Sequence, residues 1–153
     1  MTLFSKQIAF IDTLEDLIFK ELKSVINEFG FVLEENIAED QLFKKGQDGN
    51  QEPLKDQKTG RLGYTRTTIR LKISKGQPVD RITLRDEKKF HPSITIEGFE
   101  DRFEISSDVT HAKFLIKRYG ENILKPSREN MTNFMTNYFI PNIKNRIDDE
   151  IAR

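Results

Sequence analysis

The chain has 153 residues, 25 acidic and 25 basic side chains, and no cysteine. This length fits one domain with a modest core, and the lack of cysteine excludes disulfides, zinc–cysteine sites and thiol catalysis. No run of apolar residues is long enough for a transmembrane helix, and the first ten residues, MTLFSKQIAF, lack the basic and apolar regions of a signal peptide. We therefore expect no membrane association.

The charges are unevenly distributed along the chain. Residues 1–43 carry a net charge of −6, residues 44–89 a net charge of +7, and residues 90–153 a net charge of −1. A neutral chain lacks the overall positive charge on which free-standing nucleic-acid binding depends. Segregated charge suits a chain that stacks acidic face to basic face with copies of itself or with neighbours. The alternative is that these charges are ordinary solvated surface.

The first predicted element is a helix over residues 3–29, because apolar residues recur there at spacings of three and four. This stripe consists of Ile8, Ile11, Leu14, Ile18, Leu22, Val25 and Phe29. Gly30 is the expected helix stop. A weaker helical stretch follows over residues 33–45. Residues 46–63 contain four glycines and many polar side chains, which predicts a flexible arm or loop that orders against a partner.

Residues 64–75, YTRTTIRLKISK, have an ambiguous pattern. Apolar or β-branched residues alternate with basic ones, which favours a strand with one basic face. A basic helix is the alternative. Residues 81–85, RITLR, predict another short strand.

A hairpin and a short helix come next. Alternation at Ile94–Ile96 and Phe103–Ile105, with a turn between, predicts two antiparallel strands with one buried face. Ser107 or Asp108 is the expected N-cap of the following helix, which ends at Gly120. Its apolar stripe consists of Ala112, Leu115, Ile116 and Tyr119.

The last predicted helix begins at Ser127, an N-cap residue, and Pro141 predicts a kink or break near residues 139–140. Its apolar positions are Met131, Phe134, Met135, Tyr138, Ile143, Ile147 and Ile151. The pattern as a whole predicts an α+β fold: one domain over residues 1–153, with a long N-terminal helix and C-terminal helices packed on a small, mainly antiparallel sheet.

No pattern of catalytic or metal-binding residues is present. The two histidines, His91 and His111, lack metal-ligand spacing, and there is no P-loop, dinucleotide-binding motif or nucleophile elbow. We therefore predict no enzyme activity, catalytic residue, cofactor or metal. The basic stretch 61–89, which includes Tyr64, leaves open a second hypothesis: a small nucleic-acid-binding accessory protein.

Residues 84–120, LRDEKKFHPSITIEGFEDRFEISSDVTHAKFLIKRYG, resemble the head–tail joining, or tail-completion, proteins of long-tailed bacteriophages. The family shows Thr-Gly-x-Leu-x-x-Ser before a hairpin, then a short helix that ends in an aromatic–Gly pair. Phe90 and Ser93 stand at the leucine and serine positions, and Tyr119-Gly120 is the aromatic–Gly pair. Glu87-Lys88 stands where the family has Thr-Gly. With the last helix, the resemblance covers about residues 82–153.

The resemblance implies a structural virion protein, a subunit of a ring in the neck or at the head-proximal end of the tail. A tail terminator ring is the alternative within this class. The implied partners are six or twelve copies of the chain and neighbouring neck, portal-adaptor or tail-tube proteins, with genomic DNA passing through the lumen without sequence-specific contact. The implied location is the virion, after assembly in the host cytoplasm. Our candidates for subunit contacts are Arg61, Arg66, Arg70, Lys72, Tyr138, Ile143 and Ile147.

Overall fold

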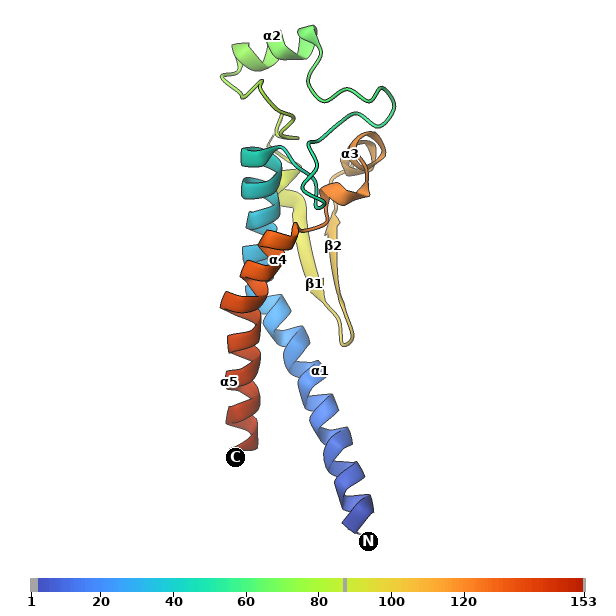
Figure 1. Cartoon of the computed structure of the whole chain (residues 1–153), viewed down its shortest axis with the longest axis vertical. Coiled ribbons are helices and arrows are strands. Elements are labelled where there is room, and N and C mark those ends of the chain that lie inside the picture. The colour runs from blue at the N-terminus through green and yellow to red at the C-terminus, as the bar shows by residue number, and fades with distance from the viewer. Residues whose placement is uncertain (1–2, 87, 153) are drawn as a thin grey trace.

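The structure, a computed structural model, describes residues 3–86 and 88–152, and for residues 3–10 it describes the backbone alone. The side chain of Ile8 and all of Glu87 therefore lie outside the described residues. The fold is α+β, as predicted, with long helices at both ends of the chain and a two-stranded antiparallel sheet (Figure 1). No described helix has the length and apolar character needed to cross a membrane.

One continuous helical run forms the first third of the chain. Helix α1 (Leu3–Glu35) continues directly into the π-helix η1 (Asn36–Lys45), and Gly46, at φ +61°, ends the run. The predicted stop at Gly30 is wrong. Gly30 is instead buried where α1 meets the sheet: a β-carbon placed on it would lie 3.4 Å from the β-carbon of Ile96.

The predicted hairpin is confirmed, and α1 protects its edge. Strands β1 (Ile94–Gly98) and β2 (Phe103–Ser107) pair with Ile96 opposite Ile105. On the other side of β1, the Ile96 N–H donates to Glu34 Oε1 (2.7 Å) and the Gly98 N–H donates to Asn27 Oδ1 (2.8 Å). These bonds satisfy backbone groups that an open sheet edge would leave without partners.

The segment at residues 64–75 is a helix, so the prediction of a strand is wrong and the alternative is right. Helix α2 spans Arg66–Ser74, and the hydroxyl of Thr65 caps it by accepting from the Thr68 N–H (3.2 Å). Residues 81–85 form no strand. Instead, the Thr83 N–H donates to the Tyr64 hydroxyl (2.9 Å). This bond holds the segment that follows α2, residues 75–90, against the start of α2, and we call this segment the connector.

Short turns and three helices complete the chain. Their bounds are η2 (His91–Ser93), α3 (Ala112–Tyr119), η3 (Glu121–Ile123), α4 (Arg128–Phe134), the π-helical turn η4 (Met135–Phe139) and α5 (Ile140–Ile151). The cap at Ser127 is confirmed, since its hydroxyl accepts from the Asn130 N–H (3.1 Å). The cap predicted at Ser107 or Asp108 is wrong: α3 begins at Ala112, after His111, and no side chain caps it.

Pro141 does not break the helical run. The helix type changes between Phe139 and Ile140, at the predicted place, which puts Pro141 in the first turn of α5. Proline has no N–H to donate, and the π-helical turn before it, in which the Ile140 N–H donates to the Met135 carbonyl, shifts the hydrogen-bond pattern at this point of the run.

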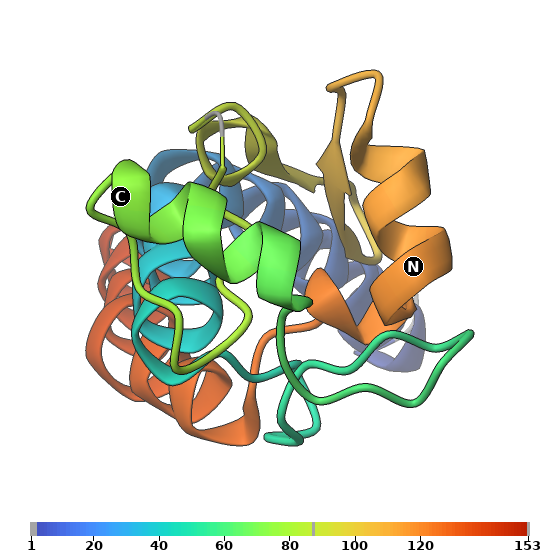
Figure 2. The same cartoon turned by 90° about the horizontal axis from the view of Figure 1, so that it is seen from above.

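The molecule is elongated. Its core gathers at one end, where Leu33, Ile37 and Leu42 are buried together with Phe90, Ile123 and Phe134. At the other end, the N-terminal half of α1 and the whole of α5 project from this body and diverge (Figure 1). We call these two projecting helices the stalk. Helix α2 covers the opposite end of the molecule, as the view from above shows (Figure 2).

Candidate functional site

The described residues contain no group of histidines, cysteines or acids placed to hold a metal ion. The loop at residues 46–63 lies against the body: Leu54 is buried, the Gln57 N–H donates to the Arg118 carbonyl (2.7 Å) and the Gly49 N–H donates to the Asn122 carbonyl (2.8 Å). The loop, which leads from η1 to α2 along the chain, is therefore held against the α3 region by hydrogen bonds.

The candidate contact residues fall at two separate ends of the molecule. Arg61, Arg66 and Arg70 are exposed on the loop and on α2. Lys72 does not share this exposed face, because it points inward and is only 4% exposed. The structure therefore separates Lys72 from the other basic candidates.

The C-terminal candidates also divide into two kinds. Tyr138 is partly buried and packs against the core, with its ring centroid 6.5 Å from that of Phe29 and 6.4 Å from that of Phe134. Ile143 and Ile147 are half-buried on α5, which belongs to the stalk. All three side chains are therefore partly accessible, Tyr138 beside the core and the two isoleucines on the stalk.

Arg146 joins α5 to the middle of α1. Arg146 of α5 donates to Ser24 Oγ (2.6 Å) and forms ion pairs with Glu21 (3.3 Å) and Glu28, all on α1. Beyond this contact, large apolar side chains remain exposed: Ile11 is 54% exposed, Phe19 42% and Ile151 62%. These side chains lie on projecting helices that the rest of the chain does not cover (Figure 1).

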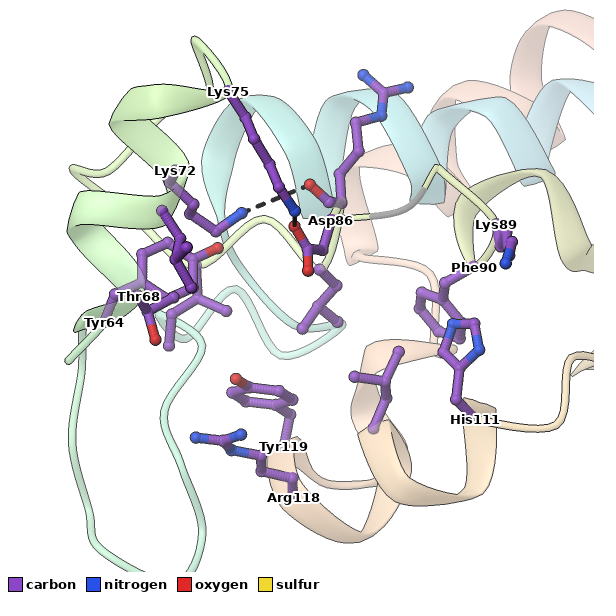
Figure 3. Close-up of a pocket in the computed structure, with 15 residues that line it drawn as sticks. Tyr64, Thr68, Lys72, Lys75, Asp86, Lys89, Phe90, His111, Arg118 and Tyr119 are labelled. Atoms are coloured by element: carbon purple, nitrogen blue, oxygen red, sulfur yellow. Dashed lines mark hydrogen bonds and ion pairs between the residues drawn. The ribbon is translucent and has the colours of Figure 1, made fainter.

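The opposite end of the molecule contains a cavity of about 420 Å³ between α2 and α3. Side chains from α2, from the connector after it and from α3 face one another across this space (Figure 3). Its walls contain apolar, aromatic and basic side chains and one described carboxylate. The lining residues are Tyr64, Thr68, Leu71, Lys72, Lys75, Ile82, Leu84, Arg85, Asp86, Lys89, Phe90, His111, Leu115, Arg118 and Tyr119.

Three of the cations that line the cavity are held by carboxylates. Lys75 Nζ lies 2.8 Å from Asp86, Arg118 Nε lies 2.9 Å from Asp56, and Arg85 pairs with Glu39. The hydrogen bond from Lys75 lowers the pKa of Asp86, and burial opposes this effect only in part. Asp86 therefore remains ionised and fixes the position of Lys75.

Lys72 is held differently. Its ammonium donates to the Gln77 side-chain carbonyl (3.0 Å) and to the Arg85 backbone carbonyl (3.5 Å), and it lies 4.7 Å from the centre of the Tyr64 ring (Figure 3). No described carboxylate forms an ion pair with it. The groups in direct contact with this buried cation are thus neutral, and the charge of Asp86 acts on it without forming an ion pair.

The backbone of the connector is strained beside the cavity. Leu84, which lines the cavity, has φ +53°, a conformation that bulky residues rarely adopt. Sequence reasoning missed Leu84, Asp86 and the inward orientation of Lys72. The Thr65–Thr68 pair is the one local signal of helix α2, and a helix there would have placed Lys72 on a different face from Arg66 and Arg70.

His91 is buried beneath the same connector. Its Nε2 lies 2.8 Å from the Thr83 carbonyl, and its buried Nδ1 has no hydrogen-bond partner. Burial lowers the pKa of His91 to about 4, and the charge of Arg85 adds to this effect, while the bond to Thr83 and the charge of Glu39 oppose it. His91 is therefore neutral in the folded protein at pH 7 and acts as a core residue.

No protein-family model, curated protein or solved structure matches this chain.

Proposed function

We propose that the chain is a structural subunit that assembles with its own copies into a ring, at the neck or head-proximal tail end of a long-tailed bacteriophage. The supporting observation is the stalk, whose exposed apolar side chains include Ile11, Phe19 and Ile151. A monomer leaves this apolar surface in water, whereas contact with neighbouring subunits buries it. The resemblance of residues 82–153 to tail-completion proteins supplies the biological setting.

The surfaces also differ from one end of the molecule to the other. The stalk is apolar and acidic, with Asp12, Glu15 and Asp16 exposed, while α2 exposes Arg66 and Arg70. A contact between two different surfaces is heterologous, and repeated heterologous contacts close into rings when the rotation between subunits allows it. Such a protein works by geometry and needs no catalytic residue.

The test is the mass of the protein in solution, measured by light scattering over a range of concentrations. We expect the wild-type chain to grow towards one discrete species of six or twelve copies. The double variant Ile11→Ser/Phe19→Ser removes apolar area from the exposed stalk and should need a concentration at least about tenfold higher to assemble, because a loss of about 1.4 kcal/mol in contact energy changes affinity tenfold.

The matched control is Phe114→Ser, which removes an exposed aromatic side chain from α3, outside the stalk. We expect this variant to assemble like the wild-type chain. A wild-type chain that stays monomeric at every concentration, or a stalk variant that assembles as readily as the wild type, contradicts the proposal.

A second candidate function is nucleic-acid binding by α2. Arg66 and Arg70 lie about one helical turn apart and are both exposed, a spacing that lets two side chains contact one phosphate backbone. Salt-sensitive DNA binding by the monomer, abolished by Arg66→Ala/Arg70→Ala, would favour this function over the ring.

A further inference from the structure

We propose that the cavity between α2 and α3 binds a small organic anion, in which one phosphate or carboxylate group is attached to an aromatic or aliphatic body. Nothing in this inference depends on the ring proposal, because the cavity belongs to a single chain and lies at the end of the molecule opposite the stalk (Figure 1).

The charge of the lining favours an anion. Five cations line the cavity, namely Lys72, Lys75, Arg85, Lys89 and Arg118, and Asp86 is the one carboxylate among the described lining residues. These cations come from α2, from the connector after it and from α3. The positive charges of three segments thus face one half-open cavity, whose walls exclude part of the surrounding water and strengthen the interactions of charges there.

Lys72 supplies the most specific reason for an anion. An ammonium group removed from water loses much of its hydration energy, and neutral hydrogen-bond acceptors replace only part of it. Lys72 is 4% exposed, and its described partners are an amide, a backbone carbonyl and an aromatic ring. An anion in the cavity would give this buried ammonium a direct ion-pair partner, which Asp86, acting on it without an ion pair, does not supply.

The positions of the other cations suit reversible binding. Arg85 and Arg118 are fixed from outside the cavity by Glu39 and Asp56, so they are already ordered before a ligand arrives. Lys75 instead pairs with Asp86 on the exposed side. Exposed ion pairs are weak, so Lys75 is able to exchange Asp86 for a ligand anion.

The remaining walls define the other part of the ligand. Leu71, Ile82, Leu115 and the rings of Tyr64 and Tyr119 line the cavity. The volume of about 420 Å³ lies within the range of sites for small organic molecules. Inorganic phosphate would leave these apolar walls unfilled, so an apolar or aromatic body attached to the anion should raise the affinity.

The experiment is calorimetric titration of the full chain at low salt with phenyl phosphate, benzoate, inorganic phosphate and phenol. We expect one phenyl phosphate or one benzoate to bind per chain, with the two fragments, phosphate and phenol, binding at least tenfold more weakly. The ratio between phenyl phosphate and benzoate identifies the preferred anionic group. Failure of both aromatic anions to bind saturably overturns the proposal.

Two variants locate the binding in the cavity. Lys72→Met keeps the length of the side chain and removes its charge, so we expect at least a tenfold loss of affinity for the tighter of the two aromatic anions. Leu71→Glu places a negative charge on an exposed residue of the rim, where folding tolerates it, and should cause a similar loss.

The control is Lys117→Met, which removes an exposed charge from α3 outside the cavity and should leave the affinity within twofold of the wild type. Equal binding by the wild type, Lys72→Met and Leu71→Glu overturns the proposal, and so does an equal loss in the control. The stoichiometry per chain is the same for monomers and rings, so the titration can fail while the ring proposal stands.

Discussion

His91 makes the stability of the folded chain depend on pH. In the folded protein burial lowers the pKa of His91 to about 4, whereas an unfolded chain has a histidine pKa of about 6.5. The unfolded state therefore takes up a proton first as the pH falls. His91 contributes roughly 3 kcal/mol to the free energy of unfolding above about pH 6.5. This contribution is lost as the pH falls through about 4.

We predict that His91→Gln flattens the pH dependence of the free energy of unfolding between about pH 6.5 and 5, measured by urea denaturation. The glutamine amide can still donate to the Thr83 carbonyl, so the fold should persist. His111→Gln, at a half-exposed position, is the control and should keep the wild-type slope. Equal slopes for wild type and His91→Gln would show that His91 is not the titrating group.

The packing of α1 on the hairpin depends on two glycines with different surroundings. A β-carbon on Gly98 would lie 2.9 Å from the Lys23 carbonyl and 3.0 Å from Ile26, both on α1. A β-carbon on Gly30 would meet Ile96 at 3.4 Å, an ordinary van der Waals distance. Close packing therefore requires glycine at residue 98 but not at residue 30.

We predict opposite effects for the two alanine substitutions. Gly98→Ala forces the strand away from the helix and should lower the free energy of unfolding by roughly 1–3 kcal/mol. Gly30→Ala removes a flexible residue from a helix interior and should raise it by up to about 1 kcal/mol. Urea denaturation at low protein concentration measures both effects. If Gly98→Ala is as stable as the wild type, the close contact between β1 and α1 is refuted.

Some local signals predicted the structure correctly, whereas others, such as the stop at Gly30, were overridden by packing with distant parts of the chain. The hairpin alternation and the cap at Ser127 are local, and both are confirmed. The alternation in residues 64–75 predicted a strand because it assumed one buried face. The segment is instead helix α2, which leaves Leu71 and Ile73 exposed, and neither described strand pairs with it.

The candidate site was harder to predict than the fold. Lysine is rarely buried, so a sequence pattern assigns Lys72 to the surface. Its burial results from the connector, which returns across α2 and places Gln77 and the Arg85 carbonyl around the ammonium. This return path follows from Tyr64 and Thr83, which form a contact between residues 19 positions apart. Such a contact has no signature in local periodicity.

At the scale of the whole molecule, the charge segregation of the sequence becomes a separation in space. Of the acidic segment, residues 3–43 form α1 and most of η1, and α1 extends along the stalk. The basic segment, residues 44–89, includes the loop and α2 at the other end (Figure 1). In the proposed ring, attraction between the acidic segment of one subunit and the basic segment of the next would use this separation to order the subunits.

Ring assembly should therefore weaken as salt rises, because screening shortens the range of charge interactions from about 10 Å at 0.1 M salt to about 3 Å at 1 M. We predict that Arg66→Glu/Arg70→Glu weakens assembly at low salt and removes most of its salt dependence, as followed by light scattering. The matched control, Lys113→Glu/Lys117→Glu, reverses two exposed charges on α3 and should retain the wild-type salt dependence. If the wild-type chain assembles equally well at low and high salt, the segregated charges do not drive assembly. The apolar side chains of the stalk would then be the source of subunit attraction.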